Sequence, residues 1–274
     1  MRIDKFRFFL GIVLAVAIVF CVAAVYTGFV KHVPAASPDR DTLYQISTID
    51  ALMQGVYDGN GMIADLKKHG DFGIGTFDRL DGEMIMLDGR VWQAKADGTV
   101  SLAADNQTTP FAMVTYFDSD IRQITTEHAM NFSEFTTAMS AQLPSQNMIY
   151  AVKIHDTFPS VTVRAIPAQE KPYPTLTDAA KHQKIFTYTN VTGTVVGFYM
   201  PPFLKGLNVV GYHLHFLADD HQRGGHILDL TVPPGSTVQY DVTPDFTMEI
   251  PTTGAFAGMN FSADESAALT AVER

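Results

Sequence analysis

The sequence predicts an α+β protein whose mixed and antiparallel sheets form two closely packed subdomains. Its predicted helices and hairpin-like strands do not alternate as βα units, which argues against a doubly wound parallel sheet. Of the 274 residues, 46% are hydrophobic and 18% are charged, which is typical of a globular chain rather than a disordered one. A chain of this length can bury a sizeable core.

Residues 1–33 are predicted to be a signal peptide or a membrane anchor. Arg2, Lys5 and Arg7 form a basic start, no charged residue occurs from Phe8 to Val30, and Lys31 closes the apolar run. The apolar run is long enough for either role. The basic flank predicts a cytoplasmic N-terminus, so we expect the rest of the chain to be exported to the periplasm or the extracellular space. If the leader is not cleaved, it would tether the protein to a membrane.

The exported part begins after a linker at residues 34–41. The only cysteine, Cys21, lies in the leader, so the exported part has no intramolecular disulfide and no thiol ligand. A proline-rich stretch from Pro167 to Pro174 predicts a boundary between an N-terminal α+β subdomain, residues 42–166, and a C-terminal subdomain, residues 167–274. The net charge of −10 argues against binding to nucleic acid, whose phosphates would be repelled.

The first element expected in the exported part is an amphipathic helix. Apolar residues recur at spacings of three and four from Leu43 to Val56. Asp39 or Asp41 is expected to cap this helix, which would end near Gly59.

Strands and two further helices are expected after it. The dipeptide Asp88-Gly89 predicts a hairpin between strands 83–87 and 90–93. The other predicted strands are 148–155 and 161–166, joined by a turn at 157–160, then 193–200, 209–217 and 226–232. The predicted helices are 133–142, capped by Asn131, and 176–183, capped by Thr175.

Three histidines are placed where one metal ion could collect them. His213 and His215 alternate on a strand, so their side chains share a face and lie roughly 7 Å apart. His226 opens the strand that returns after the loop, and it can reach the same face. Three imidazoles with an open fourth position are typical of a catalytic zinc site. We therefore expect the metal site on strands of the C-terminal half, and His221, in the loop between these strands, to be solvated.

Two charged residues lie in apolar strands. Arg164 is flanked by apolar and β-branched residues, where an arginine is costly unless it is paired or faces a ligand. Glu83 opens a strand whose same face carries Ile85 and Leu87. By themselves, these two residues could equally be solvated at strand edges.

Several of these pieces together resemble alpha-acetolactate decarboxylase. The resemblance spans about Thr42 to Glu273. It rests on Thr76 with the Asp-Gly-Glu-Met run at 81–84, on Val-Arg at 163–164, and on Gly-Tyr-His-Leu-His-Phe at 211–216 with Gly-Gly-His at 224–226.

The resemblance implies a zinc enzyme that converts 2-acetolactate to acetoin and carbon dioxide. His213, His215 and His226 would bind Zn²⁺. Glu83 and Arg164 would be active-site residues with Thr76 nearby. The family also has a glutamate near its C-terminus, which is Glu273 here, with Glu265 as the alternative. A homodimer is expected from the family alone.

The chemistry of a 2-hydroxy-3-oxo acid agrees with these residue types. The carboxylate is β to a ketone, so the ketone can accept the electrons that carbon dioxide leaves behind, and no pyridoxal or thiamine cofactor is required. Zinc would stabilise the resulting enediolate. Arg164 would orient the carboxylate, and Glu83 or Glu273 would supply a proton.

Two other functions remain open. Another exported zinc lyase or a cupin-type metalloenzyme also uses His-x-His, and Asp219 could then be the cupin carboxylate. A non-catalytic metal- or solute-binding module would keep the histidines, but it gives no reason for Arg164 and Glu83 to lie in apolar strands.

Overall fold

The computed structural model describes residues 40–118, 122–252 and 254–273. The predicted leader at 1–33 and most of the linker at 34–41 lie outside these residues. Within the described ranges, no helix is long and apolar enough to cross a membrane. The described residues belong to one compact unit.

In the described part of the chain, seven strands form a first sheet in the order β15-β1-β8-β3-β4-β5-β6. They are β1 (Thr42–Ile46), β3 (Phe72–Thr76), β4 (Glu83–Leu87), β5 (Arg90–Ala94), β6 (Val100–Leu102), β8 (Ala112–Thr115) and β15 (Asp245–Glu249). Neighbouring strands are antiparallel except β1 and β15, which are parallel. The hairpin predicted at Asp88-Gly89 is confirmed as β4 and β5. Two short strands, β2 (Gly61–Met62) and β7 (Thr108–Thr109), pair separately.

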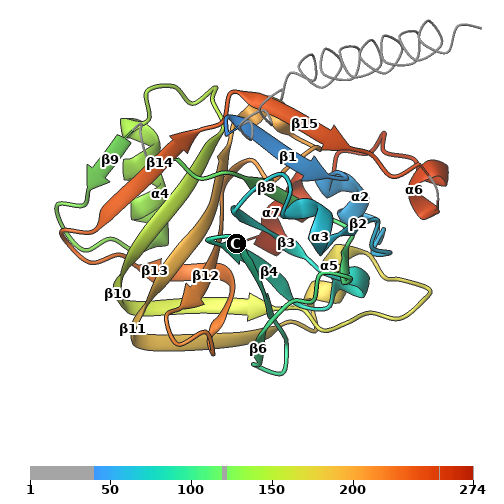
Figure 1. Cartoon of the computed structure of the whole chain (residues 1–274), viewed down its shortest axis with the longest axis horizontal. Coiled ribbons are helices and arrows are strands. Elements are labelled where there is room, and N and C mark those ends of the chain that lie inside the picture. Colours follow the sequence, from blue (N-terminus) through green and yellow to red (C-terminus); the bar gives the residue numbers. More distant parts are fainter. Residues whose placement is uncertain (1–39, 119–121, 253, 274) are drawn as a thin grey trace, which may run out of the picture. The chain divides into compact units, whose positions relative to one another are not determined.

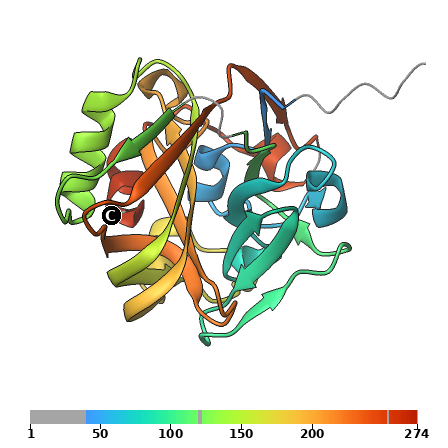
Figure 2. The same cartoon turned by 60° about the vertical axis from the view of Figure 1, so that its left-hand side comes forward.

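A second sheet, with six strands among the described residues, has the order β11-β12-β13-β10-β14-β9. Its strands are β9 (Arg122–Thr125), β10 (Tyr150–Ala165), β11 (Lys184–Met200), β12 (Gly211–Ala218), β13 (Gly224–Thr231) and β14 (Thr237–Val242). Because β10 also pairs with β11, the strands β10 to β13 close on themselves. Figures 1 and 2 show the two sheets as neighbouring layers. A mixed, sheet-dominated α+β fold is therefore confirmed.

Short helices connect and cover the sheets. They are α2 (Ile49–Met53), α3 (Ile63–Leu66), α4 (Phe132–Gln142), α5 (Leu176–Ala180), α6 (Ala255–Gly258) and α7 (Ser266–Glu273), with 3-10 turns η1 (Asp78–Leu80) and η2 (Pro202–Leu204). The predicted caps of α4 and α5 are confirmed. The Asn131 side chain accepts a hydrogen bond from the Glu134 N–H, and the Glu134 carboxylate accepts one from the Asn131 N–H. Thr175 caps α5.

The helix predicted from Leu43 to Val56 is wrong in its first part. The chain forms β1 first, and α2 begins only at Ile49, with Thr48 as its N-cap in place of Asp39 or Asp41. Leu43 packs into one core cluster, whereas Tyr44 and Ile46 pack into another on the opposite face. The segment is thus buried on both sides, as in a central strand, and its three-residue apolar spacing was not a helical period.

The turn predicted at 157–160 is also wrong, because the two predicted strands are one. β10 runs without a break from Tyr150 to Ala165 and pairs with β11 along its length. Phe158 is fully buried, which a surface turn would not allow. Pro159 causes only a local irregularity, since it lacks an N–H group to donate to the neighbouring strand.

Both sheets contain strands from before and after the predicted boundary at Pro167. β10 lies within the sheet that contains β11 to β14, and β15 pairs with β1. A shared core cluster contains Ile85 of β4 and Phe198 of β11, and the rings of Phe72 and Phe198 meet edge to face at 5.9 Å. β4 also packs against β12 and β13. The junction between the sheets is where the predicted site residues meet.

Candidate active site

The strand register aligns three site residues in one row across the second sheet. Arg164 of β10 is the direct partner of His226 on β13, and His226 is the direct partner of His215 on β12. His213 lies two residues before His215 and therefore shares its face. One ligand nitrogen from each of the three histidines lies within 4.8 Å of the others. The predicted histidine cluster is therefore present.

Burial keeps these imidazoles neutral. Burial lowers the pKa of His213 to about 3, and the positive charge of Arg164 acts in the same direction. Burial likewise lowers the pKa of His215 and His226 well below the usual value. A neutral imidazole is the form that binds a metal, so the site is already in its ligating protonation state.

A second contact fixes the orientation of His215. Its Nδ1 donates to the backbone carbonyl of Met84 at 2.9 Å, and Met84 belongs to the facing strand β4. A histidine that donates one ring N–H to a carbonyl presents its other nitrogen to a metal, an arrangement common in metal sites. The first sheet thus orients a histidine of the second.

Glu83 faces the histidines from the first sheet. Its Oε2 lies 3.8 Å from Nε2 of His215. Burial raises the pKa of Glu83 to about 7, against the lowering effect of Arg164. A carboxyl group with such a pKa can hold or release a proton near neutral pH.

The turn before Glu83 is strained and firmly held. Arg79 and Leu80 both have positive φ angles, of 63° and 62°. Such conformations are unusual for non-glycine residues and cluster at functional sites. The Thr76 hydroxyl donates to the Gly82 carbonyl at 2.7 Å, and the Gly82 N–H donates to the Ile166 carbonyl at 3.0 Å. Thr76 therefore supports the turn that positions Glu83.

Arg164 holds the C-terminal helix α7 against the histidines. Its side chain donates to Oε1 of Glu273 at 3.1 Å and to the carbonyl of Val272. The other oxygen of Glu273 lies 3.5 Å from Nε2 of His213 and 3.6 Å from Nε2 of His226. Burial raises the pKa of Glu273, whereas Arg164 lowers it. Glu273, at the end of α7, reaches the cluster, while Glu265 precedes the helix at its opposite end.

These groups surround a small chamber of about 30 Å³. Its polar side is made of the three histidines, Arg164, Glu83, Glu273 and Thr76. Its apolar lining comes from Ile49, Leu52, Leu80, Phe111, Ile166 and Leu176. This apolar wall has no signal in the sequence, because its residues are ordinary core residues there and only the fold brings them together.

The polar atoms of the chamber fit a bound cation. Of the seven buried side-chain nitrogen and oxygen atoms that lack a hydrogen-bond partner among the described residues, five belong to this site. Four of them, Nδ1 of His213, Nε2 of His215, Nε2 of His226 and Oε2 of Glu273, can bind a cation, and the fifth, Nε of Arg164, can donate to an anionic group. Buried polar atoms are rarely left without a partner, so this concentration indicates a ligand. Nitrogen and carboxylate oxygen atoms are the donor set that zinc accepts.

Two other residues considered from the sequence lie elsewhere. Asp219 contacts His155 at 3.2 Å, and both side chains are about half exposed, so Asp219 is no ligand of the cluster. His221 stacks on Trp92 with ring centroids 4.2 Å apart. His221 is exposed in the loop, as expected, and it is not part of the cluster.

The comparisons with known proteins agree with this geometry. The family model of alpha-acetolactate decarboxylase matches residues 43–263. The alpha-acetolactate decarboxylase of Methanosarcina mazei is 47% identical over 234 residues, covering 85% of this chain and 81% of that protein. That of Methylococcus capsulatus is 42% identical over 240 residues, covering 88% and 91%.

A solved structure of the same family extends the match to the fold. The crystal structure of alpha-acetolactate decarboxylase from Bacillus subtilis strain 168 superposes with a TM-score of 0.81 at 36% identity, covering 85% of this chain and 98% of that one. The family model ends at residue 263, so the position of Glu273 in the site rests on the structure described here. The chain belongs to the alpha-acetolactate decarboxylase family and is a carboxy-lyase.

Proposed function

We propose that this enzyme decarboxylates 2-acetolactate to acetoin and carbon dioxide with a zinc ion held by His213, His215 and His226. The observation that carries the proposal is the gathering of three buried neutral histidines, an arginine and two carboxyl groups around one chamber. When bound, the zinc ion would supply positive charge opposite the oxygen on which negative charge develops.

Arg164 is the group that orients the substrate. Its guanidinium is buried and faces the chamber, and its Nε has no partner among the described residues. A guanidinium binds a carboxylate through paired hydrogen bonds, which fixes the plane of the carboxylate. Arg164 would align the carbon–carbon bond that breaks with the π system of the neighbouring ketone.

Glu83 and Glu273 are the candidates for the proton step. The electron pair of the broken bond passes into the ketone and gives an enediolate, which then takes a proton at carbon to become acetoin. Burial raises the pKa of both carboxyl groups, to about 7 for Glu83, and this favours the protonated form that can give the proton. Because Glu83 lies on β4 and Glu273 lies at the end of α7, the one that donates would determine the face of protonation and thus the configuration of acetoin.

The apolar wall supports this step by excluding water. Leu80, Phe111 and Ile166 are part of it, and all three are almost fully buried. In a site without bulk water, charges interact more strongly, and the intermediate is protonated by a positioned acid rather than by solvent.

Two broader properties are part of the proposal. The apolar leader would direct the enzyme out of the cytoplasm, with a membrane tether if it is not cleaved. The family resemblance suggests a homodimer. Fractionation of cells that express the full chain, and light scattering of the purified domain, would test the two properties separately.

The direct test uses the soluble protein from Ala35 onward with racemic 2-acetolactate. We expect acetoin and carbon dioxide in equal amounts. His213→Ala should lose activity and bound zinc, whereas His182→Ala, at an exposed histidine outside the site, should keep both. Absence of acetoin from a folded, zinc-loaded sample would instead favour another lyase or a non-catalytic binding module.

A further inference from the structure

A large groove lies on the other side of the C-terminal helix from the chamber. Its volume is about 1070 Å³, against about 30 Å³ for the chamber. Small-molecule sites measure roughly 300–1,000 Å³, whereas a cavity like the chamber holds only about two water molecules. Only a small part of a substrate fits in the chamber as it stands, whereas the groove has room for a larger substituent.

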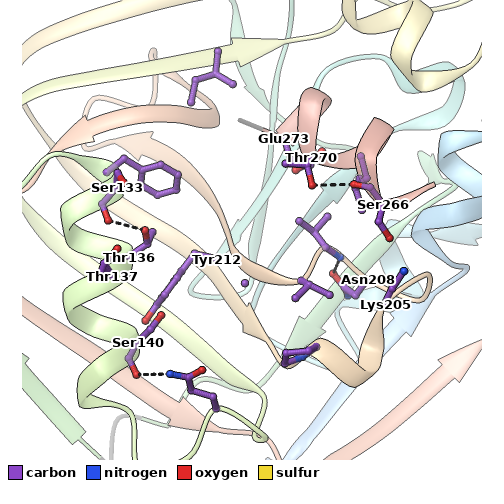
Figure 3. A pocket seen from close by; sticks show the side chains of 18 of the residues that line it. Ser133, Thr136, Thr137, Ser140, Lys205, Asn208, Tyr212, Ser266, Thr270 and Glu273 are labelled. Carbon is purple, nitrogen blue, oxygen red and sulfur yellow. Dashed lines mark hydrogen bonds between the residues drawn. The ribbon is translucent and has the colours of Figure 1, made fainter. Parts of the chain in front are cut away.

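The side chain of Glu273 lies between the chamber and the groove. It lines the chamber and the groove, and it is held between Arg164 and the histidines. Thr270, one turn earlier on α7, lines the groove as well. Figure 3 shows Glu273, Thr270 and Ser266 on one side of the groove, facing α4 on the other. A substrate anchored at Arg164 is thus separated from the groove by one side chain.

The groove is lined by hydroxyl groups from two helices. Ser133, Thr136, Thr137 and Ser140 recur at helical spacing and form one face of α4. Ser266 and Thr270 do the same on α7. Tyr212 of β12 lies between the two helices. A solvated helix face usually carries charged residues, but this face of α4 carries none. Its hydroxyl groups can instead exchange hydrogen bonds with the hydroxyl groups of a neutral ligand.

The charges around the groove exclude acidic groups. Asp50, Asp229 and Glu273 line it, and Lys205 is the basic residue in the lining. The ammonium of Lys205 is already paired with Asp264 at 2.8 Å. The groove is therefore negative overall, which repels a second carboxylate.

We propose that this groove is a substrate subsite that binds hydroxylated substituents of 2-hydroxy-3-oxo acids larger than 2-acetolactate. The inference rests on the proposed function, because that function places the reacting carbons beside Arg164. Each hydroxyl of such a substituent can both donate to and accept from the serine and threonine side chains of α4 and α7.

The test compares three kinds of substrate with the purified zinc-loaded enzyme. The first is 2-acetolactate. The second carries a hydroxyalkyl chain in place of the acetyl methyl or of the methyl at C2, and the third carries an alkyl chain of equal length at the same positions. Wild-type enzyme should decarboxylate at least one hydroxyalkyl compound with a kcat/KM about tenfold or more above that of its alkyl match.

Variants that fill the groove separate a subsite from a structural role. Thr137→Trp, at an exposed position of α4, should lower kcat/KM for the hydroxyalkyl compound by about tenfold or more, and for 2-acetolactate by less than about twofold. Ser133→Trp is a second filling variant in case the first does not fold. Gln142→Trp, exposed on the same helix but outside the groove lining, should change neither value.

Three outcomes would overturn the inference. If wild-type enzyme forms acetoin but accepts no hydroxyalkyl compound, or prefers the alkyl match, the groove is no hydroxyl subsite and the proposed function stands. If the filling variants lower kcat/KM for 2-acetolactate and for the longer compounds equally, the groove is only a route by which every substrate reaches the chamber. If no acetoin forms at all, the proposed function fails first and the subsite with it.

Discussion

Removing Arg164 alone is predicted to destabilise the metal-free protein more than removing Arg164 and Glu273 together. The perturbation is a double-mutant cycle of Arg164→Met, Glu273→Gln and the double variant. The pair is suited to it because the side chains are only 4% and 9% exposed and lie 3.1 Å apart.

The magnitude follows from that burial. Arg164→Met leaves a carboxylate in the chamber without its partner, and breaking a buried ion pair in this way costs about 3–5 kcal/mol of unfolding free energy. The double variant has no unpaired charge. It loses mainly the hydrogen bond to the Val272 carbonyl, which costs about 1–3 kcal/mol. The difference between these two costs is about 2 kcal/mol, and any cost of Glu273→Gln, which leaves Arg164 unpaired, adds to it. The coupling free energy between the two residues should therefore be at least about 2 kcal/mol in favour of the pair.

Urea unfolding measures this quantity. Circular dichroism in the presence of a chelator would follow all four proteins, so that metal binding does not contribute to the unfolding free energy. Glu265→Gln in place of Glu273→Gln is the control, and its coupling to Arg164→Met should be near zero. A coupling below about 0.5 kcal/mol for Glu273 would show that α7 is not held by this ion pair in solution.

Three further variants test the other groups of the site. His226→Ala should lower zinc affinity by more than about 100-fold. Losing a residue that only supports a metal ligand already costs about 10–100-fold, and losing the ligand itself costs more. Equilibrium dialysis with metal analysis measures the zinc affinity. Glu83→Gln should lower kcat by about 10²–10⁴-fold in the acetoin assay, because the amide has no proton to give. Thr76→Val should cost about 1–3 kcal/mol of unfolding free energy by removing the hydrogen bond to Gly82, while zinc content stays unchanged.

Each of these has an outcome that contradicts it. Unchanged zinc affinity in His226→Ala would remove the three-histidine site. Near-normal kcat in Glu83→Gln would leave Glu273 as the sole candidate for the proton step. Zinc loss in Thr76→Val with unchanged stability would mean that the Thr76 hydroxyl acts at the metal rather than on the turn.

Local patterns predicted the strands of the histidine cluster well. His213, His215 and His226 could be placed because alternation on one strand and return on the next are set by backbone geometry alone. The caps at Asn131 and Thr175 could be predicted for a similar reason, since a cap depends on residues within one turn.

Long-range packing explains what the sequence did not reveal. The strand at Thr42–Ile46 looked helical because both of its faces are buried, and the two core clusters that cover them are built from distant parts of the chain. The apolar wall around Leu80 and Phe111 had no signal of its own. The role of Thr76 was also hidden, because its hydrogen bond to Gly82 depends on a strained turn that residue types alone do not predict.

The account depends most on metal-assisted decarboxylation at the histidine cluster. The most direct measurement is acetoin formation from racemic 2-acetolactate by the soluble protein from Ala35 onward. The zinc content of the protein is measured first, and the zinc is then removed with a chelator and added back. We predict stoichiometric zinc, loss of acetoin formation after chelation, and recovery when zinc is added back. Undiminished acetoin formation by protein proven free of metal would contradict the account.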